Sequence, residues 1–521
     1  MEAEPSYAEI KELVLQIKEA LAKQDTPSLQ TLLNSVKHGK AQHVVDFVAP
    51  LLFQPENNAE DMSLAGDEAL GLISRLVHSD SSTYLKPVSR AVKQEAVLRA
   101  SSDQSMHVSN QLMTVIIDQL SSTDVEVSSN ATEAMVACCR RLGPSISSPC
   151  IDSITQVFIQ AYENMSKDRS TSSIICVRCA SVIVDLIVAL GDQVMDKAKS
   201  SGATDMLLKM LTNCETDPLL AMSVMDLIER MATSNPMHGN RAHFLCSNDV
   251  LDPLLTMAGG KEDSPGPDPI LGGSALRVLS AICRLGQRDS SLFGDSEHQR
   301  LLQGFHKALE NFRGTGELDR LALVDAISSF AASSPDALEM VLNDPRTKED
   351  WLLLSVAQPK LKAVILTSVA MVIDPAPEKD INGKPVTTTA NLPSSAMAMK
   401  LFTQLGNTNN SQDSTELLLE LAKSPIQETR LGAYNLMRAV ATRITTGSQV
   451  LLSHTGFYEF LIRREGESTK EGKEGKFAIV EAVYKSPAKG LLADDIVRKL
   501  EQILKQGAHY VEPLKPELMT D

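Results

Sequence analysis

The segment Ala275–Gly286, ALRVLSAICRLG, carries the pattern that decides the fold. The small residue Ala275 is followed three positions later by Val278 and six positions later by Ala281. Small and apolar residues at this spacing lie on one face of an α-helix. We therefore predict a helix that buries this face and turns the opposite face to solvent.

The same pattern returns along the chain at similar intervals. Its instances start at positions 131, 180, 221, 275, 320, 364, 433 and 476, roughly 41 to 54 residues apart with one gap near 69. The matches that start at 320, 364 and 476 are weaker, mainly at their first position. Another short apolar helix precedes most instances, as in STELLLELAKS before position 433. This rhythm indicates one helix pair per interval, close to the 40-odd residues of armadillo and HEAT repeats.

The predicted fold is all-α, an armadillo/HEAT-like α-solenoid in which stacked helix pairs form a superhelix. A chain of 521 residues is too long for one compact core, whereas a repeat array has no such limit on length. Aromatic residues make up only 4% of the chain, which favours packed helices over sheets. We expect one solenoid over 1–521, with diverged repeats in 1–200 and clearer repeats in 201–521. Exposed loops are predicted at three places: 258–273, 374–395 and 464–475.

Charge and cysteine content limit the possible partners and the compartment. The formal net charge of −16 disfavours nucleic acid and anionic membranes as partners. The eight cysteines are scattered through apolar segments, as expected of reduced thiols. The N-terminus is acidic and amphipathic, unlike a secretory signal, and we see no apolar run long enough to span a membrane. We therefore expect a cytoplasmic protein, with the nucleus as a second compartment.

Motifs of the common enzyme classes are absent from the sequence. The chain contains no GxxxxGK[ST], no GxSxG and no HExxH. The lysine and glycine run around Gly472 and Gly475 resembles a phosphate-binding loop only superficially, because Lys470 stands where its first glycine should be. Glu471 and Glu474 would also repel a phosphate. A solvated turn between two helices is favoured here, and we expect no enzymatic activity and no cofactor.

Two other features allow a structural and a functional interpretation. Cys176 and Cys179 form a CxxC, but they share one helical face, so two buried thiols are favoured over a metal or redox site. We expect no metal site. Several methionines follow helical spacing and are best explained as core residues, although a methionine-rich docking groove stays open as an alternative. They are Met206, Met210, Met222, Met225 and Met231.

The solvent-facing side of the repeated helices is the strongest candidate for a binding surface. The fifth position after each opening residue points away from the packed face, and the next turn adds a second residue on that side. Ser280 and Arg284 are one such pair. In a solenoid these positions line up along one surface, usually the binding surface. We call the predicted partner-binding residues on it the charged ladder: Asp185, Asp226, Arg230, Arg284, Asp325, Arg438, Glu481 and Lys485.

An alternative explanation of the charged ladder is a solvated face with local ion pairs. Asp226 and Arg230 are four residues apart, as are Glu481 and Lys485, and such pairs stabilise exposed helices. If the ladder binds a partner, reversing the charges of Arg230 and Arg284 together should weaken binding with little loss of helicity.

The C-terminal repeat carries a specific family resemblance. The segments GFYEFLIRR, GKFAIVEAVYKS and GAHYVEPL, with a charged loop after the first, resemble the end of the 26S proteasome non-ATPase regulatory subunit 5 family. That family has a Gly-Phe-x-Glu-aromatic helix, a Lys-aromatic-x-apolar-Val-x-Ala helix and a closing Tyr-Val-x-Pro. The matching residues are Gly456, Phe457, Glu459, Phe460, Lys476, Phe477, Val480, Ala482, Tyr510, Val511 and Pro513.

The resemblance implies an assembly chaperone for the base of the 26S proteasome regulatory particle. Such a protein would bind the C-terminal domain of an ATPase subunit, together with an associated non-ATPase base subunit, and leave before the mature particle forms. It would be a monomer within this hetero-complex. The alternative is an armadillo/HEAT adaptor for another protein partner, in transport or trafficking. Peptide-binding armadillo proteins usually repeat asparagine and tryptophan along the groove, whereas here Asn435 is isolated and Trp351 lies outside the repeated pattern.

Overall fold

The computed structural model describes the chain from Asn110 to Tyr510, with short gaps, and a few residues before it. The earlier residues are Gln16 and positions 89–90, 92–93 and 96–97. The gaps are 123, 214–216, 235–238, 260–267, 313–316, 356, 376–377, 380–384, 387–391, 412, 464–466, 487–488 and 491. We predicted diverged repeats in 1–200, and most of the part that precedes Asn110 lies outside the described residues. The motif residues Val511 and Pro513 lie outside them as well.

The chain forms two compact units, which are described separately. The first comprises Met1–Leu227 with Pro236–Arg241, and the second comprises Ile228–Asn235 with Ala242–Asp521. The boundary falls within helices α12 and α13. The predicted division of the repeats at residue 200 stays a prediction.

The described part of the first unit is helical. Helix α7 packs on α6 and α9, and α9 packs on α8, so consecutive helix pairs are stacked. The helices of this unit, with the two that reach the boundary, are α6 (Asn110–Leu120), α7 (Val125–Leu142), α8 (Pro144–Asn164), α9 (Arg169–Leu190), α10 (Asp192–Ser200), α11 (Ala203–Thr212), α12 (Pro218–Thr233) and α13 (Gly239–Leu245).

The second unit is a longer stack of helices with one short strand pair. Strands β1 (Glu378–Lys379) and β2 (Pro385–Val386) pair antiparallel. The helices are α14 (Asn248–Gly259), α15 (Pro269–Arg288), the 3-10 turn η1 (Ser290–Leu292), α16 (Asp295–Phe312), α17 (Glu317–Ser333), α18 (Pro335–Asn343), α19 (Pro345–Leu352), α20 (Pro359–Ile373), α21 (Ser395–Thr408), α22 (Ser414–Leu421), α23 (Gln427–Arg443), α24 (Gly447–Ser453), α25 (Thr455–Ile462), α26 (Lys470–Lys485) and α27 (Asp494–Gln506).

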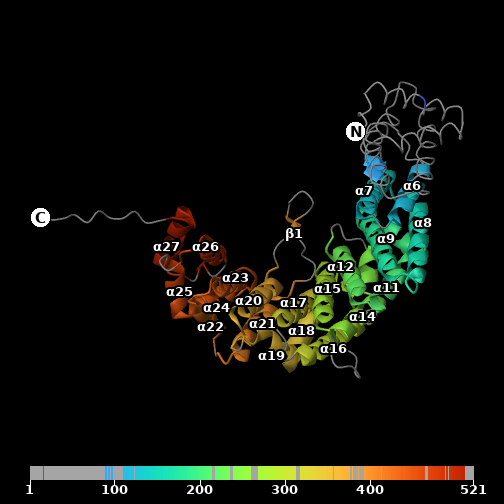
Figure 1. Cartoon of the computed structure of the whole chain (residues 1–521). Helices are drawn as coiled ribbons and strands as arrows, with labels where there is room; N and C mark the ends of the chain where they lie inside the picture. The colour runs from blue at the N-terminus through green and yellow to red at the C-terminus, as the bar shows by residue number, and fades with distance from the viewer. Residues whose placement is uncertain are drawn as a thin grey trace, which may run out of the picture. The chain divides into compact units, whose positions relative to one another are not determined.

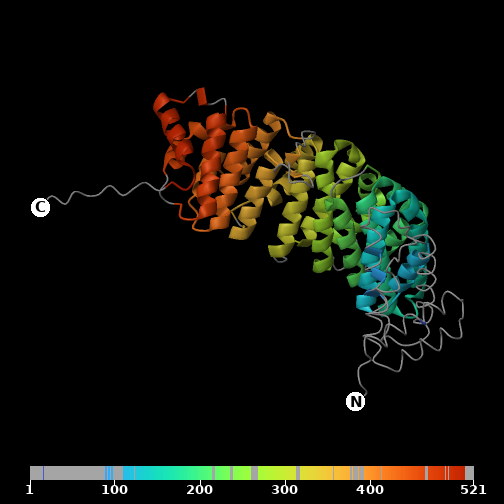
Figure 2. The ribbon, with the colours of Figure 1, turned by 90° about the horizontal axis from the view of Figure 1, so that it is seen from above.

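Five helices of the second unit, one from each successive repeat, form a continuous row. Helix α15 packs on α17, α17 on α20, α20 on α23, and α23 on α26. Figure 1 shows this row along one edge of the unit, and Figure 2 shows the same helices in chain order from above. We call these five the row helices. The remaining helices, such as α14, α16 and α21, pack behind them.

The row helices confirm the predicted repeat and the armadillo/HEAT-like solenoid fold. Helices α7, α9, α12, α15, α17, α20, α23 and α26 each contain one of the segments selected from the sequence. The small and apolar positions of the opening segment are buried: Ala275 and Val278 have no exposed surface. The face that the spacing of these residues defines is therefore the face that packs between helices.

Local sequence explains where the row helices begin and how they are held. Asp268 precedes α15 and accepts hydrogen bonds from the backbone N–H groups of Ile270 and Leu271. Such a cap satisfies N–H groups that have no partner within the helix. Trp351, the single tryptophan, is fully buried in α19, and its Nε1 donates to Ser368 Oγ of α20 at 2.9 Å. This buried bond joins one repeat's first helix to its second.

Two predicted loops are shorter than expected, because helices extend into them. Helix α14 continues to Gly259 and α15 starts at Pro269, so both ends of the predicted loop 258–273 are helical. Helix α26 starts at Lys470, so 470–475 of the predicted loop 464–475 is helical as well. Thr469 caps this helix by accepting from Gly472 N–H, which allows two glycines and four charged residues in 470–475. The prediction for 374–395 agrees better, since α20 ends at Ile373 and α21 starts at Ser395.

Helix α9 is long and apolar enough to cross a membrane, because it has 22 residues and contains an 18-residue stretch with a mean hydropathy of 2.3. The predicted absence of such a run was therefore wrong for this segment. In the structure α9 packs against α7, α8 and α10. Its Arg178 donates to the carbonyl oxygens of Leu120 and Ser122 at 2.8 and 2.6 Å. These contacts are those of a core helix between repeats.

Candidate functional site

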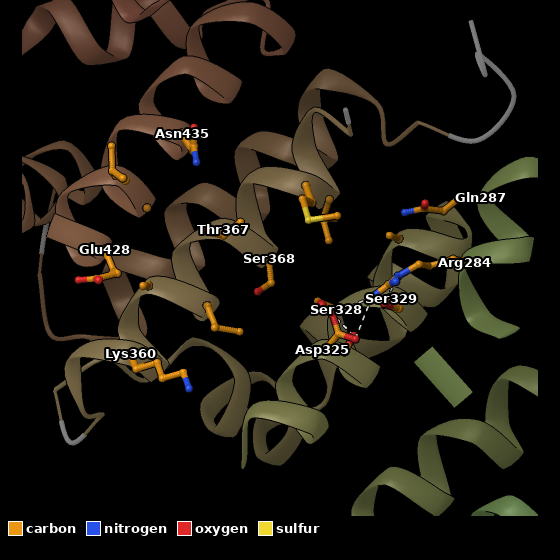
Figure 3. Close-up of a pocket in the computed structure, with 17 residues that line it drawn as sticks. Arg284, Gln287, Asp325, Ser328, Ser329, Lys360, Thr367, Ser368, Glu428 and Asn435 are labelled. Atoms are coloured by element: carbon orange, nitrogen blue, oxygen red, sulfur yellow. Dashed lines mark hydrogen bonds and ion pairs between the residues drawn. The ribbon is translucent and has the colours of Figure 1, made fainter. Parts of the chain in front are cut away.

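A groove of about 410 Å³ lies across four of the row helices. Helix α20 forms its floor, α17 and the end of α15 form one wall, and α23 forms the other wall. Figure 3 shows Arg284, Asp325 and Ser329 on one side of the groove and Glu428 and Asn435 on the other. The groove therefore lies on the surface that the sequence singled out as the candidate binding surface.

Small side chains create the hollow. The walls and floor carry Ala332, Ala363 and Gly432 where larger residues would fill the space. Gly432 also permits close packing of α23 on α20, because a Cβ there would lie 3.2 Å from the Ala363 carbonyl oxygen. Close helix approach with small residues at the surface produces a groove without separating the helices.

The floor of the groove is apolar. Val364 is partly exposed, and Met371, two helical turns further along α20, has 47% of its surface exposed. Leu431 of α23 adds a partly exposed side chain from the opposite wall. A large exposed methionine is costly in water and is typical of surfaces that bind other apolar side chains.

One wall is fixed by a network of ion pairs and hydrogen bonds. Arg284 of α15 donates to both carboxylate oxygens of Asp325 of α17, at 2.9 and 2.8 Å. Ser280 donates to Asp325 at 2.5 Å, and its hydroxyl lies 2.9 Å from that of Ser329. The network joins two adjacent repeats. Because Arg284 and Asp325 satisfy each other, their charges are already neutralised at the groove.

The opposite end of the groove carries two further charges. Lys360, near the start of α20, and Glu428, near the start of α23, are exposed and form no ion pair with another described residue. Figure 3 shows both side chains near one end of the groove, away from Gln287. The two ends of the groove thus differ. The end with Lys360 and Glu428 is charged, and the end with Gln287 is polar and uncharged.

The structure brings together only part of the charged ladder. Arg284 and Asp325 line the groove and contact each other. Arg438 does not line it, because its guanidinium binds Asp374, directly after α20, at 3.0 Å. Ser280 was predicted to face solvent, and this was wrong. It is 1% exposed because α17 packs closely over it and supplies Asp325 and Ser329 as partners.

The remaining ladder residues lie elsewhere. Glu481 and Lys485 form the predicted i, i+4 ion pair at 2.7 Å on α26, outside the groove. Asp226 is exposed and Arg230 half-buried on α12, and Asp185 is half-buried on α9 of the first unit. A partner-binding role for these residues stays a prediction.

The sequence reasoning missed the groove residues on α20. The charged ladder includes no residue of this helix, and the fifth position after Val364, Val369, is fully buried. The helix is almost entirely apolar, so periodicity does not distinguish its two faces. The polar residues Lys360 and Thr367, seven positions apart on one face, were the signal that could have found it.

The glycines of the charged C-terminal run serve packing. Glu467 is 7% exposed and accepts from Arg430 Nε and Nη2, both at 3.2 Å, and from Tyr434 Oη at 3.0 Å. A Cβ on Gly472 would overlap the Glu467 carboxyl group, and one on Gly475 would lie 3.2 Å from the Tyr434 ring. Gly472 therefore lets α26 pack against the Glu467 carboxylate, and Gly475 lets it pack against Tyr434 of α23.

The Glu467 network also shifts pKa values. Burial alone would raise the pKa of the Glu467 carboxyl, but hydrogen bonds from Arg430, Tyr434 and Thr469 outweigh it and hold the pKa below its usual value. Burial, together with the Glu467 charge, raises the pKa of Tyr434. The Glu467 carboxylate is therefore kept ionised although it is buried, and its hydrogen bonds are made to side chains of this chain.

The cysteines of the CxxC are core residues, as predicted. Cys176 and Cys179 have no exposed surface, and burial raises the pKa of Cys176 to about 12. The seven cysteines of the described residues are thiols, not disulfides. Among those residues no cluster of three histidine, cysteine or acidic side chains is placed to hold a metal ion. Of the methionines considered for a docking groove, Met210, Met225 and Met231 have no exposed surface.

Curated relatives of this chain carry the name of a 26S proteasome non-ATPase regulatory subunit. A family model described as the proteasome non-ATPase 26S subunit matches residues 8–517. The 26S proteasome non-ATPase regulatory subunit 5 of Mus musculus is 21% identical over 379 residues, which cover 70% of this chain and 68% of the relative. The Homo sapiens protein of the same name is 19% identical over the same length, with the same coverage of both chains.

Solved helical-repeat structures are similar at lower levels. An engineered protein is 14% identical, with 92% of this chain and 99% of that chain covered and a TM-score of 0.43. Kap121p bound to Pho4p is 13% identical, with 95% of this chain and 51% of Kap121p covered and a TM-score of 0.47. At these scores the likeness adds nothing about function.

Proposed function

The chain belongs to the proteasome non-ATPase 26S subunit family, and from this premise we propose that it is an assembly chaperone for the base of the 26S proteasome regulatory particle. It binds the C-terminal domain of an ATPase subunit, with an associated non-ATPase base subunit, and leaves before the mature particle forms. It acts as a monomer within this hetero-complex. The family match over nearly the whole chain is the observation that carries the proposal.

The mechanism in this proposal is steric. While the chaperone occupies the ATPase domain, that domain cannot dock elsewhere until the other subunits of the base are in place. The groove over α17, α20 and α23 supports this, because it offers an apolar floor with charged and polar walls to a protein partner. Arg284 and Asp325 of the charged ladder contribute by fixing the shape of one wall.

The proposal includes no catalytic step. A helix-pair stack in a proteasome regulatory family supports a scaffold, and the buried thiols are poor nucleophiles because the pKa of each of Cys176, Cys179 and Cys246 is raised to about 12. We also propose a cytoplasmic location with the nucleus as a second compartment. The seven described thiols support a reducing environment.

Affinity purification of the tagged full chain from a cell lysate tests the proposal. We expect proteasomal ATPases and a non-ATPase base subunit at stoichiometric levels, and no subunits of the proteolytic core. Separation of the same lysate by size should place the chain in a precursor complex smaller than the complete particle. Absence of proteasomal ATPases, or a constant amount of the chain in complete particles, would contradict the proposal.

A further inference from the structure

The backbone chemistry of the groove limits what can bind there. Its floor and walls are the sides of α15, α17, α20 and α23, whose backbone N–H and C=O groups are paired within the helices. An extended peptide laid on the apolar floor would leave its own backbone groups unpaired, at a cost of about 1–3 kcal/mol for each buried group. An occupant must therefore satisfy its backbone hydrogen bonds internally or from side chains of the groove.

Apart from Gln287 and Thr367, the groove offers few uncharged polar side chains that could replace those bonds. Asn435 is the single asparagine that lines it, and Ser328, Ser329 and Ser368 are short or already bonded within the protein. Trp351 is buried beneath the floor and donates to Ser368 instead of presenting its indole to a ligand. The repeated asparagine and tryptophan side chains that would hold an extended peptide are therefore lacking among the residues that line this groove.

The dimensions and the apolar pattern match a helix. Val364 and Met371 are seven residues apart on α20, about 10 Å along the axis at 1.5 Å per residue. Two turns of a partner helix span the same length and present apolar residues at i, i+3 or i+4, and i+7. A groove of about 410 Å³ receives a few such side chains while the helix itself lies above it.

Charge at the rim defines the flanks of the occupant. Arg284 is neutralised by Asp325, so the charges left for a partner are Lys360 and Glu428 at one end. Lys360 lies in the first turn of α20, where the helix dipole disfavours a cation, so an acidic partner residue would relieve this. A basic partner residue complements Glu428, and the other end, with Gln287 and Asn435, suits uncharged polar residues.

We propose that this groove binds an amphipathic α-helix of the ATPase C-terminal domain. Its apolar stripe contacts Val364, Met371 and Leu431, an acidic residue near one end of the helix meets Lys360, and a basic residue near the same end meets Glu428. This rests on the proposed function, because the ATPase subunit supplies the helix. It adds the conformation of the bound segment, the residues that hold it and the charge pattern that selects it.

The test uses the purified full chain and the separately purified C-terminal domain of each proteasomal ATPase, with binding measured by calorimetry. Met371→Asp is expected to weaken binding at least about tenfold, because a carboxylate would be buried against the apolar stripe. Lys360→Glu should weaken binding about threefold or more and alter its salt dependence. Met371 is already half-exposed, so neither variant should change the circular dichroism spectrum.

Ile270→Asp is the matched control. Ile270 is 65% exposed in the first turn of α15, outside the groove, and its replacement adds the same charge to the same unit. This variant should bind as the unchanged chain does, and Met371→Leu should restore most of the affinity that Met371→Asp loses.

Hydrogen exchange on the bound ATPase domain identifies the segment. Protection is expected in a helical segment with apolar residues at helical spacing and an acid near one end. If no ATPase domain binds the unchanged chain, the proposed function fails, and this inference fails with it. If a domain binds but Met371→Asp has no effect, or the protected segment is extended, the inference alone is overturned.

Discussion

The groove and the C-terminal turn before α26 are both rich in charge, yet the structure uses the charges differently. Glu467 in the turn and its partner Arg430 of α23 have side chains that are 3% and 15% exposed, and four hydrogen bonds from Arg430, Tyr434 and Thr469 satisfy the carboxylate. Arg284 and Asp325 at the groove are 45% and 43% exposed. Lys360 and Glu428 have no ion-pair partner among the described residues. Charge in the turn thus supports the fold, whereas the charges of Lys360 and Glu428 at the groove are left for a partner.

The largest effect on stability is expected when the buried carboxylate of Glu467 is replaced. Glu467→Gln should lower the free energy of unfolding by about 2 to 3 kcal/mol, because it leaves the Arg430 guanidinium buried without its counter-charge. Trp351 is the single tryptophan and lies buried in the same unit, so denaturant unfolding followed by its fluorescence measures the loss. Glu471→Gln, at an exposed position four residues further on, should change it by less than about 0.5 kcal/mol.

The second effect concerns the glycine that accommodates this carboxylate. Gly472→Ala should destabilise the protein by about 1 to 2 kcal/mol, since the new Cβ overlaps the Glu467 carboxyl group and outweighs the better helix propensity of alanine. Gly490→Ala is the control, because a Cβ at that position meets nothing within 4 Å. Equal unfolding midpoints for the two variants would show that Glu467 moves freely and that the turn is not tightly packed.

A smaller effect is expected from pH. The folded pKa of Glu467 lies below its ordinary value of 4.5, so its stabilising contribution is present above that pH. The contribution is lost as the pH falls from 4.5 through the folded pKa, because the unfolded chain then binds the proton more readily. The stability difference between the unchanged chain and Glu467→Gln should therefore shrink below pH 4.5. A difference that stays constant or grows on acidification would contradict the assignment.

The smallest effect on stability is expected at the groove. Arg284→Gln removes an ion pair that is nearly half-exposed, and such pairs contribute about 0–1 kcal/mol. We expect a change of less than about 1 kcal/mol in the unfolding assay, together with weaker binding of an ATPase C-terminal domain because Asp325 is then uncompensated beside the groove. A loss as large as that of Glu467→Gln would show that the Arg284–Asp325 pair supports the fold as strongly as the buried Arg430–Glu467 pair does.

Much of the fold could be predicted from the sequence, because one helix face per repeat is apolar at regular spacing. Ala275 and Val278 belong to that face and are fully buried. The starts of α15 and α26 were misplaced, since Asp268 and Thr469 cap these helices within segments that glycine and proline make look like loops. A helix cap is a signal of one or two residues, and the glycine, proline and charged residues around these two caps obscured it.

The candidate site was predicted only in part. Arg284 and Asp325 stand at polar positions opposite the packed face of the repeated pattern, so counting along the repeat found them. Met371 and Lys360 lie on a helix that is apolar on both sides, and only packing against α17 and α23 decides which side is exposed. The ion pair of Arg438 with Asp374 joins residues far apart in the chain. No local sequence pattern could therefore show that Arg438 binds a carboxylate of its own chain.

Hydroxyl-radical footprinting of the full chain, with and without a bound ATPase C-terminal domain, tests the central claim most directly. Met371 in the groove and Tyr510 in the C-terminal repeat are both reactive side chains with similar exposure, 47% and 38%. We predict that the bound domain lowers the oxidation rate of Met371 several-fold and leaves that of Tyr510 unchanged. Protection of Tyr510 with unchanged oxidation of Met371 would contradict the assignment of the groove as the binding surface.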